Sequence, residues 1–101
     1  EDQIIRESGI ELRIEAETDR VYHGVKRPLS LQAGNHSLTI QSQNFPDVVV
    51  WNPWVERCAA LSDMPSDAWR QMLCVEAAIV QEPVNLPAGE EWYGRQTLVV
   101  A

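Results

Sequence analysis

The feature that most restricts the fold of this chain is a series of short segments in which polar and apolar residues alternate. Residues 11–16, 29–32 and 36–42 all show this period of two, which is typical of a strand with one buried face. A turn signal at 33–35 separates the last two segments and predicts a hairpin. Its buried face is expected to comprise Leu29, Leu31, Leu38 and Ile40.

The other elements also read mainly as strands. Residues 47–51 form a continuous β-branched run, which indicates a central strand covered on both faces. Residues 73–80 predict a further strand, and 92–100 predict a last strand after a turn at 87–90. A short strand is also expected at 21–23.

One short helix is expected at 66–72, with Ser66 as its N-cap. Asn52-Pro53-Trp54 is expected to break the preceding strand. The pattern as a whole predicts an all-β fold, an antiparallel β-sandwich with one short helix, in a single domain over residues 1–101.

Size and charge narrow the classes of function. The chain has 101 residues and a net charge of −7, which disfavours binding to nucleic-acid phosphates. No apolar run approaches the roughly 20 residues that span a bilayer, so we expect no membrane partner. The two cysteines, Cys58 and Cys74, lie among apolar neighbours and predict buried free thiols, in keeping with a cytoplasmic location.

Glu76 lies within the most apolar stretch of the chain, residues 72–80. A buried carboxylate needs a partner or a task, and burial raises its pKa towards the range of a general base. The alternative is a strand residue that points to water while its neighbours point inward, which is the common state of glutamate. The strand alone favours this alternative.

Three segments in this order resemble one family: Glu17-Thr18-Asp19-Arg20-Val21-Tyr22, Val49-Val50-Trp51-Asn52-Pro53-Trp54 and Met72-Leu73-Cys74-Val75-Glu76-Ala77. Together they resemble the C-terminal part of the D-hexose-6-phosphate mutarotases, or glucose-6-phosphate 1-epimerases. These enzymes belong with the aldose 1-epimerases of the galactose mutarotase superfamily. The resemblance implies a large β-sandwich in the cytoplasm, with no metal and no organic cofactor.

The resemblance also implies a reaction, the interconversion of the α and β anomers of a hexose 6-phosphate. A glutamate takes the proton from the C1 hydroxyl, and a histidine gives a proton to the ring oxygen as the ring opens. Such chemistry needs one base and one acid whose environments separate their pKa values.

Carried across residue by residue, the resemblance makes Glu76 the catalytic base. Asp19 matches the family's active-site aspartate, whose acceptor oxygens suit sugar hydroxyls. Trp51 falls near the expected sugar pocket, with Asn52 and Trp54 as further candidates for substrate binding. For Asn52 and Trp54 a tight Asn-Pro turn that packs two indoles into the core is an equal alternative.

The chain also departs from the family. The family's catalytic histidine and phosphate-binding arginines lie in an N-terminal part, and neither His23 nor His36 stands where the acid would. Three explanations stay open: a segment of a longer epimerase, a short protein that forms a homo-oligomer through exposed sheet edges, or a non-catalytic carbohydrate-binding domain.

Overall fold

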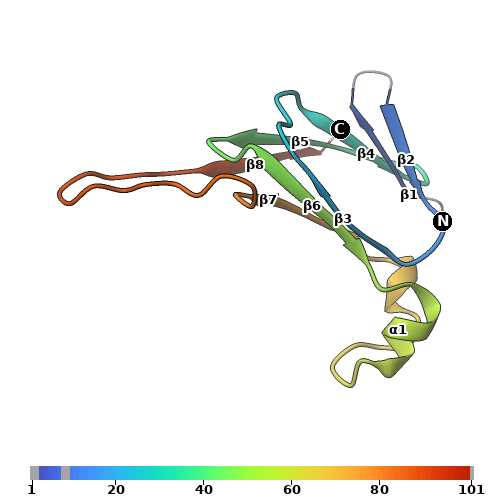
Figure 1. Cartoon of the computed structure of the whole chain (residues 1–101). Helices are drawn as coiled ribbons and strands as arrows, with labels where there is room; N and C mark the ends of the chain where they lie inside the picture. The colour runs from blue at the N-terminus through green and yellow to red at the C-terminus, as the bar shows by residue number, and fades with distance from the viewer. Residues whose placement is uncertain (1–2, 8–9, 101) are drawn as a thin grey trace.

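The computed structural model describes residues 3–7 and 10–100 of the chain, and this part folds into two facing antiparallel sheets (Figure 1). The strands are β1 (Gln3–Glu7), β2 (Ile10–Ile14), β3 (Thr18–Tyr22), β4 (Leu29–Ala33), β5 (His36–Gln43), β6 (Asp47–Asn52), β7 (Cys74–Ala78) and β8 (Arg95–Val100). The larger sheet has the order β2-β1-β4-β5-β8, and the smaller sheet has the order β3-β6-β7. The expected all-β sandwich is confirmed.

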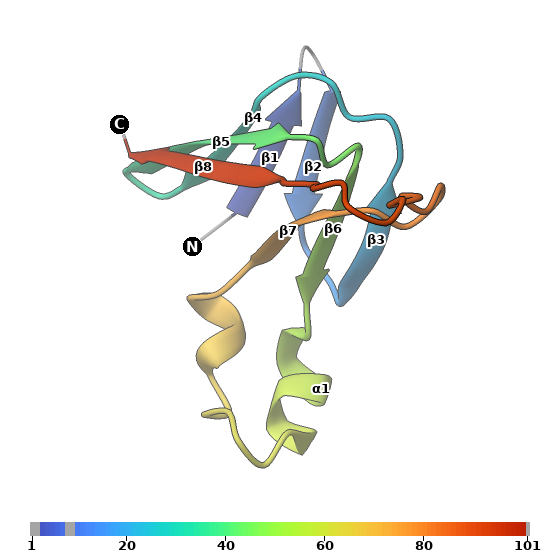
Figure 2. The same cartoon turned by 90° about the vertical axis from the view of Figure 1, so that its left-hand side faces the viewer.

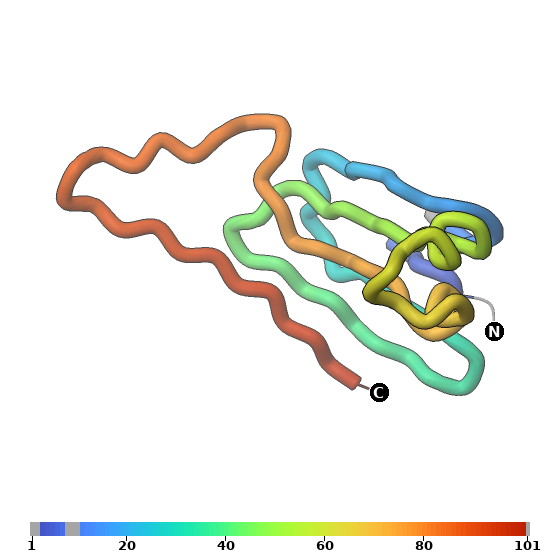
Figure 3. Tube along the Cα trace, turned by 90° about the horizontal axis from the view of Figure 1, so that it is seen from below, coloured from blue at the N-terminus to red at the C-terminus, as the bar shows by residue number. Residues whose placement is uncertain are grey.

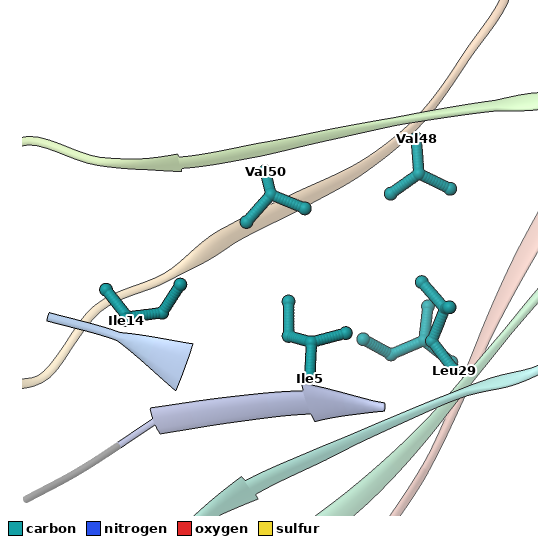
Figure 4. Packing of buried hydrophobic residues seen from close by; sticks show 6 residues of the cluster. Ile5, Ile14, Leu29, Val48 and Val50 are labelled. Carbon is teal, nitrogen blue, oxygen red and sulfur yellow. The ribbon is translucent and has the colours of Figure 1, made fainter. Parts of the chain in front are cut away.

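The core lies between the two sheets. Ile5, Ile14 and Leu29 come from the larger sheet and point towards Val48 and Val50 of β6 (Figure 4). Val50 is only 2% exposed. Since side chains alternate between the two faces of a strand, the even-numbered residues of β6 fix which face of the smaller sheet is the inner one.

The predicted hairpin forms as the alternation requires. Leu29 of β4 lies opposite Ile40 of β5, and Leu31 lies opposite Leu38. Leu29 and Ile40 are buried, and Leu31 and Leu38 pack against the same cluster. Strand β6 is central, as expected, because it pairs with β3 on one side and β7 on the other. The expected cover on both faces is wrong, since Val48 and Val50 are buried in the core while Val49 and Trp51 are only half-buried on the other face.

Strand β1 is absent from the sequence prediction, because only Ile4 and Ile5 are apolar in a segment that is otherwise polar. Pairing with both β2 and β4 makes it a strand. The last strand begins at Arg95 and not at residue 92, because Trp92 turns to stack edge-to-face on Phe45, with 5.5 Å between ring centroids.

The helical content differs from the expectation. Helix α1 (Trp54–Ala60) follows β6 directly and extends away from the smaller sheet (Figure 2). Proline is compatible with a first helical turn, so Pro53 begins a helix where the sequence reading expected only a break. The helix expected at 66–72 is a single 3-10 turn, η1 (Ala68–Arg70), and its N-cap is Asp67, not Ser66.

Residues 79–94 connect β7 to β8 and project from the body of the sandwich as a long arm (Figures 1 and 3). A turn closes its tip, where Glu90 N donates to Pro87 O over 3.1 Å and Gly89 has a φ of 83°. The turn expected at 87–90 is therefore confirmed. No helix in the described ranges is long and apolar enough to cross a bilayer.

Candidate functional site

The register of the smaller sheet brings the predicted base and the predicted sugar-binding aspartate onto one surface. Asp19 lies opposite Trp51, and Trp51 lies opposite Cys74. In the next row, Val21 lies opposite Val49, and Val49 lies opposite Glu76. Side chains two residues apart on a strand share a face. We call this surface the outer face and define it by six residues: Asp19, Val21, Val49, Trp51, Cys74 and Glu76.

The outer face is turned away from the core. Val48 and Val50 alternate with Val49 and Trp51 along β6, and they point towards the larger sheet. Asp19 and Glu76 are exposed, and Trp51 is half-buried. The two carboxylates are therefore accessible to solvent, and the Trp51 indole between them is partly covered by its neighbours.

Trp51 occupies the centre of this arrangement. It is the direct cross-strand neighbour of Asp19 and a diagonal neighbour of Glu76. With strands about 4.8 Å apart and a rise of about 3.3 Å per residue, the Cα atoms of Asp19 and Glu76 are about 12 Å apart. Two acceptor groups thus flank an aromatic surface.

Glu76 points to solvent, so the burial that the sequence allowed does not occur. Val75 and Ala77, on either side of it in β7, are partly buried on the opposite face. Glu76 therefore follows the usual alternation of an edge strand. Its own side chain faces solvent, and those of its neighbours Val75 and Ala77 face the core.

Cys74 shares the outer face with Glu76, and the two groups interact electrostatically. Partial burial raises the pKa of the Cys74 thiol, and the nearby charge of Glu76 raises it further. The thiol is therefore protonated at neutral pH and presents a small, weakly polar surface beside Trp51.

Asn52 lies on the opposite face from Trp51 and is fully buried. Its Nδ2 donates to Met72 O over 2.9 Å and to Trp69 O over 3.1 Å, and its Oδ1 accepts from Trp54 N over 2.8 Å. This side chain joins the end of β6 to α1 and to the segment that leads into β7. Its expected contact with a sugar stays a prediction.

Trp54 begins α1 with a φ of 61° and packs on Trp69, with 4.5 Å between the ring centroids. It also contacts the hydrophobic core. Trp54 therefore lies beyond the end of β6 and not beside Trp51, and a role in substrate binding stays a prediction.

The two histidines lie in different surroundings. His23 follows β3, and its Nδ1 is 3.2 Å from Oδ1 of Asp47. His36 begins β5 and is exposed in the other sheet. Neither belongs to the six residues of the outer face, so neither is placed there as a proton donor beside Glu76.

Asp47 is a feature that the sequence reading did not single out. Its carboxylate is 1% exposed and accepts from Val80 N over 2.7 Å and from Gln81 N over 3.0 Å. These two backbone donors lower its pKa most, and His23 lowers it further. An aspartate at the start of a β-branched run gives no sequence signal for this role, because its two backbone donors lie more than thirty residues away.

The described residues contain no group of three or more His, Cys, Asp or Glu side chains placed to hold a metal ion. The outer face presents two carboxylates, one indole, one thiol and two valine side chains. None of its six residues is basic, so a phosphate group would need a contact from outside this face.

Comparisons with known proteins identify a family. The family model for aldose 1-epimerase matches residues 3–99. A Cenchrus ciliaris protein provisionally named glucose-6-phosphate 1-epimerase is 35% identical over 94 residues, covering 91% of this chain and 29% of that protein. An Escherichia coli K12 protein with the same provisional name is 29% identical over 86 residues, covering 83% of this chain. The chain spans about 29% of the length of both relatives, and no solved structure matches it significantly.

Proposed function

This chain belongs to the aldose 1-epimerase family, and we propose that its outer face binds a hexose and carries the general base of an anomer-interconverting reaction. The observation that supports this most is the register that puts Asp19, Trp51 and Glu76 together on one accessible face. The names of the two relatives make a hexose 6-phosphate the substrate to test first.

The roles follow from the chemistry of each side chain. The exposed Glu76 carboxylate accepts the proton of the C1 hydroxyl as the C1–O5 bond breaks and the C1 carbonyl forms, and the ring oxygen takes a proton from solvent water. Asp19 accepts hydrogen bonds from sugar hydroxyls, since an ionised carboxylate has only acceptor oxygens. Trp51 offers a flat apolar surface to the C–H face of the sugar. Rotation about C1–C2 and closure by the reverse steps then give the other anomer.

A second candidate is sugar binding without catalysis. It is favoured by the positions of the histidines, because His23 is engaged with Asp47 and His36 lies in the other sheet. In that case the outer face supplies a binding surface alone, and the Asp19 and Glu76 carboxylates act only as hydrogen-bond acceptors. A cytoplasmic location stays a prediction for either candidate.

Anomerisation of freshly dissolved α-D-glucose 6-phosphate tests the first candidate. We expect the chain to accelerate mutarotation over the spontaneous rate and Glu76→Gln to remove most of this acceleration, since general-base catalysis contributes about 100-fold or more. Glu56→Gln on α1 is the matched control. No acceleration by the wild-type chain, with sugar-dependent tryptophan fluorescence retained, would select the binding function instead. If neither acceleration nor a fluorescence change occurs, the outer face is not a sugar site.

A further inference from the structure

A cavity opens between the two sheets, on the opposite side of β3 and β6 from the outer face. We propose that it binds an α-amino acid with an apolar side chain, whose ammonium group meets Glu7 and whose carboxylate meets Arg20. This site is separate from the outer face and does not depend on the proposed function.

The interior of the cavity is apolar. Its volume is about 400 Å³, which falls within the range of about 300 to 1,000 Å³ that is typical of small-molecule sites. Its floor is made of core side chains that point into the space between the sheets: Ile5, Leu29, Val48 and Val50 (Figure 4). An apolar group placed on this floor extends the core and removes further apolar surface from water.

The cavity opens between two unpaired sheet edges. Strand β2 ends the larger sheet and β3 ends the smaller one, so the two strands follow each other along the chain without pairing. Leu12 of β2 and Tyr22 of β3 line the cavity from these edges, and both are half-buried. A small molecule can therefore reach the apolar floor from this side of the sandwich.

Two of the charged or titratable groups that line the cavity already have partners. Glu11 accepts from Arg6 Nε over 2.8 Å. His23 Nδ1 lies 3.2 Å from Asp47 Oδ1. These two pairs largely compensate their own charges, so the electrostatic preference of the cavity depends on the remaining two groups, Glu7 and Arg20.

Glu7 and Arg20 have no oppositely charged partner within the ranges 3–7 and 10–100. Glu7 follows Ile5 by two residues on β1, and Arg20 lies opposite Val50 in the register of β3 and β6. Because Ile5 and Val50 belong to the core, strand alternation turns both charged residues towards the inner side. They line one cavity from opposite sheets, yet no ion pair joins them.

The guanidinium of Arg20 is available for a carboxylate. Its Nη1 donates to the Tyr22 hydroxyl over 3.3 Å, which keeps the side chain beside the cavity. The other N–H groups of a guanidinium can form a two-pronged contact with a carboxylate. Glu7, on the other sheet, offers only acceptor oxygens and therefore suits an ammonium group.

An α-amino acid matches this arrangement because it carries both charges on one carbon atom beside its side chain. Its carboxylate and ammonium groups would pair with Arg20 and Glu7, and an apolar side chain would lie on the core residues of the floor. An apolar acid or an apolar amine would leave one of the two protein charges without a partner. The cavity should therefore select the zwitterion.

Isothermal titration calorimetry of the full chain tests this selection with three probes of similar shape. We expect saturable binding of L-phenylalanine. Binding of 3-phenylpropionate, which lacks the ammonium group, and of 2-phenylethylamine, which lacks the carboxylate, should each be about tenfold or more weaker, because each loses a charged hydrogen-bond partner.

Charge-removing variants give the sharper test. Arg20→Gln should weaken binding of L-phenylalanine about tenfold and leave that of 2-phenylethylamine unchanged, whereas Glu7→Gln should weaken L-phenylalanine and spare 3-phenylpropionate. Structural damage would not give this crossed pattern. Arg95→Gln on β8 and Glu56→Gln on α1 are matched controls at exposed positions and should bind as the wild type does.

Three results would overturn the proposal. One is the absence of saturable binding of L-phenylalanine to a chain whose circular dichroism shows β structure. Another is equal affinity for the three probes, which would make the cavity an unselective apolar space. The third is self-association of Arg20→Val with unchanged binding of L-phenylalanine, which would assign Arg20 to protection of the β3 edge, a common task of inward-pointing charges.

Discussion

Asp19 and Glu76 stand two strands apart with Trp51 between them, and each carboxylate can approach a ligand from its own side. Their separation on the sheet is set by pairing and not by sequence distance. The outer face therefore depends on three short strands keeping their register, because a slip of one residue would turn all its side chains towards the core.

Asp19→Ala should weaken binding of glucose 6-phosphate by about tenfold or more, because hydrogen bonds to a charged group contribute about 1.5–3 kcal/mol each. Trp51 provides the signal in a fluorescence titration, and circular dichroism checks the fold. Asp67→Ala is the matched control, since Asp67 makes no side-chain capping bond to η1. Equal affinities of the two variants would remove Asp19 from the sugar site.

Asp47 should make the melting temperature of the chain depend on pH. Its folded-state pKa is lowered by the Gln81 and Val80 backbone donors, so the stabilisation is fully present above the unfolded pKa and is lost as the pH falls through the folded one. We expect the wild-type melting temperature to drop on acidification below about pH 4. Asp47→Asn should melt lower at neutral pH and lose less on acidification, while His23→Ala retains most of the acid dependence because both backbone donors remain. Parallel acid profiles of wild type and Asp47→Asn would contradict this role.

At the scale of elements, the connection from β6 through α1 and η1 to β7 places Glu76 relative to Trp51. The buried Asn52 holds this connection together, since its side-chain amide makes hydrogen bonds to the backbone of Trp54, Trp69 and Met72. The residues after α1, from Leu61 on, return the chain to the sheet. Within this return, Cys58 Sγ of α1 contacts Pro65 O at 3.2 Å.

Asn52→Ala should lower the free energy of unfolding by about 1–3 kcal/mol, because it leaves buried backbone groups without partners. Chemical denaturation followed by circular dichroism measures this loss. Asn85→Ala on the exposed arm is the control and should change stability little. An effect of similar size in both variants would mean that the junction does not depend on the Asn52 amide.

At the scale of the whole molecule, the sandwich has a hydrophobic core between its sheets and an accessible outer face, and the two free cysteines lie outside that core, Cys58 on α1 and Cys74 on β7. Cys58 is fully buried, whereas Cys74 is partly exposed beside Glu76. The arm adds a third region, because it is anchored at its base and its apolar side chains lie outside the core.

A thiol reagent should therefore modify Cys74 in the folded chain and Cys58 only on opening of the surrounding structure. Because burial and then the Glu76 charge raise the Cys74 pKa, its rate should be slow at neutral pH and rise with pH. Glu76→Gln should speed the reaction at a given pH. Mass spectrometry of peptides after timed labelling separates the two sites, and modification of Cys58 before Cys74 would contradict the burial of Cys58 on α1.

The sequence alone was enough for the strand period, the β4–β5 hairpin, the turn at the tip of the arm and the family. These depend on neighbours within a few residues, or on ordered motifs that are visible along the chain. Strand β1 and the role of Asp47 were not predictable in this way, because each depends on partners that are distant in sequence. Helix α1 was missed because Asn52-Pro53-Trp54 reads as a break in the sequence. The sequence likewise left open whether Glu76 is buried. Tertiary structure decided it, since the pairing of β7 with β6 turns Val75 to the core side and Glu76 to solvent.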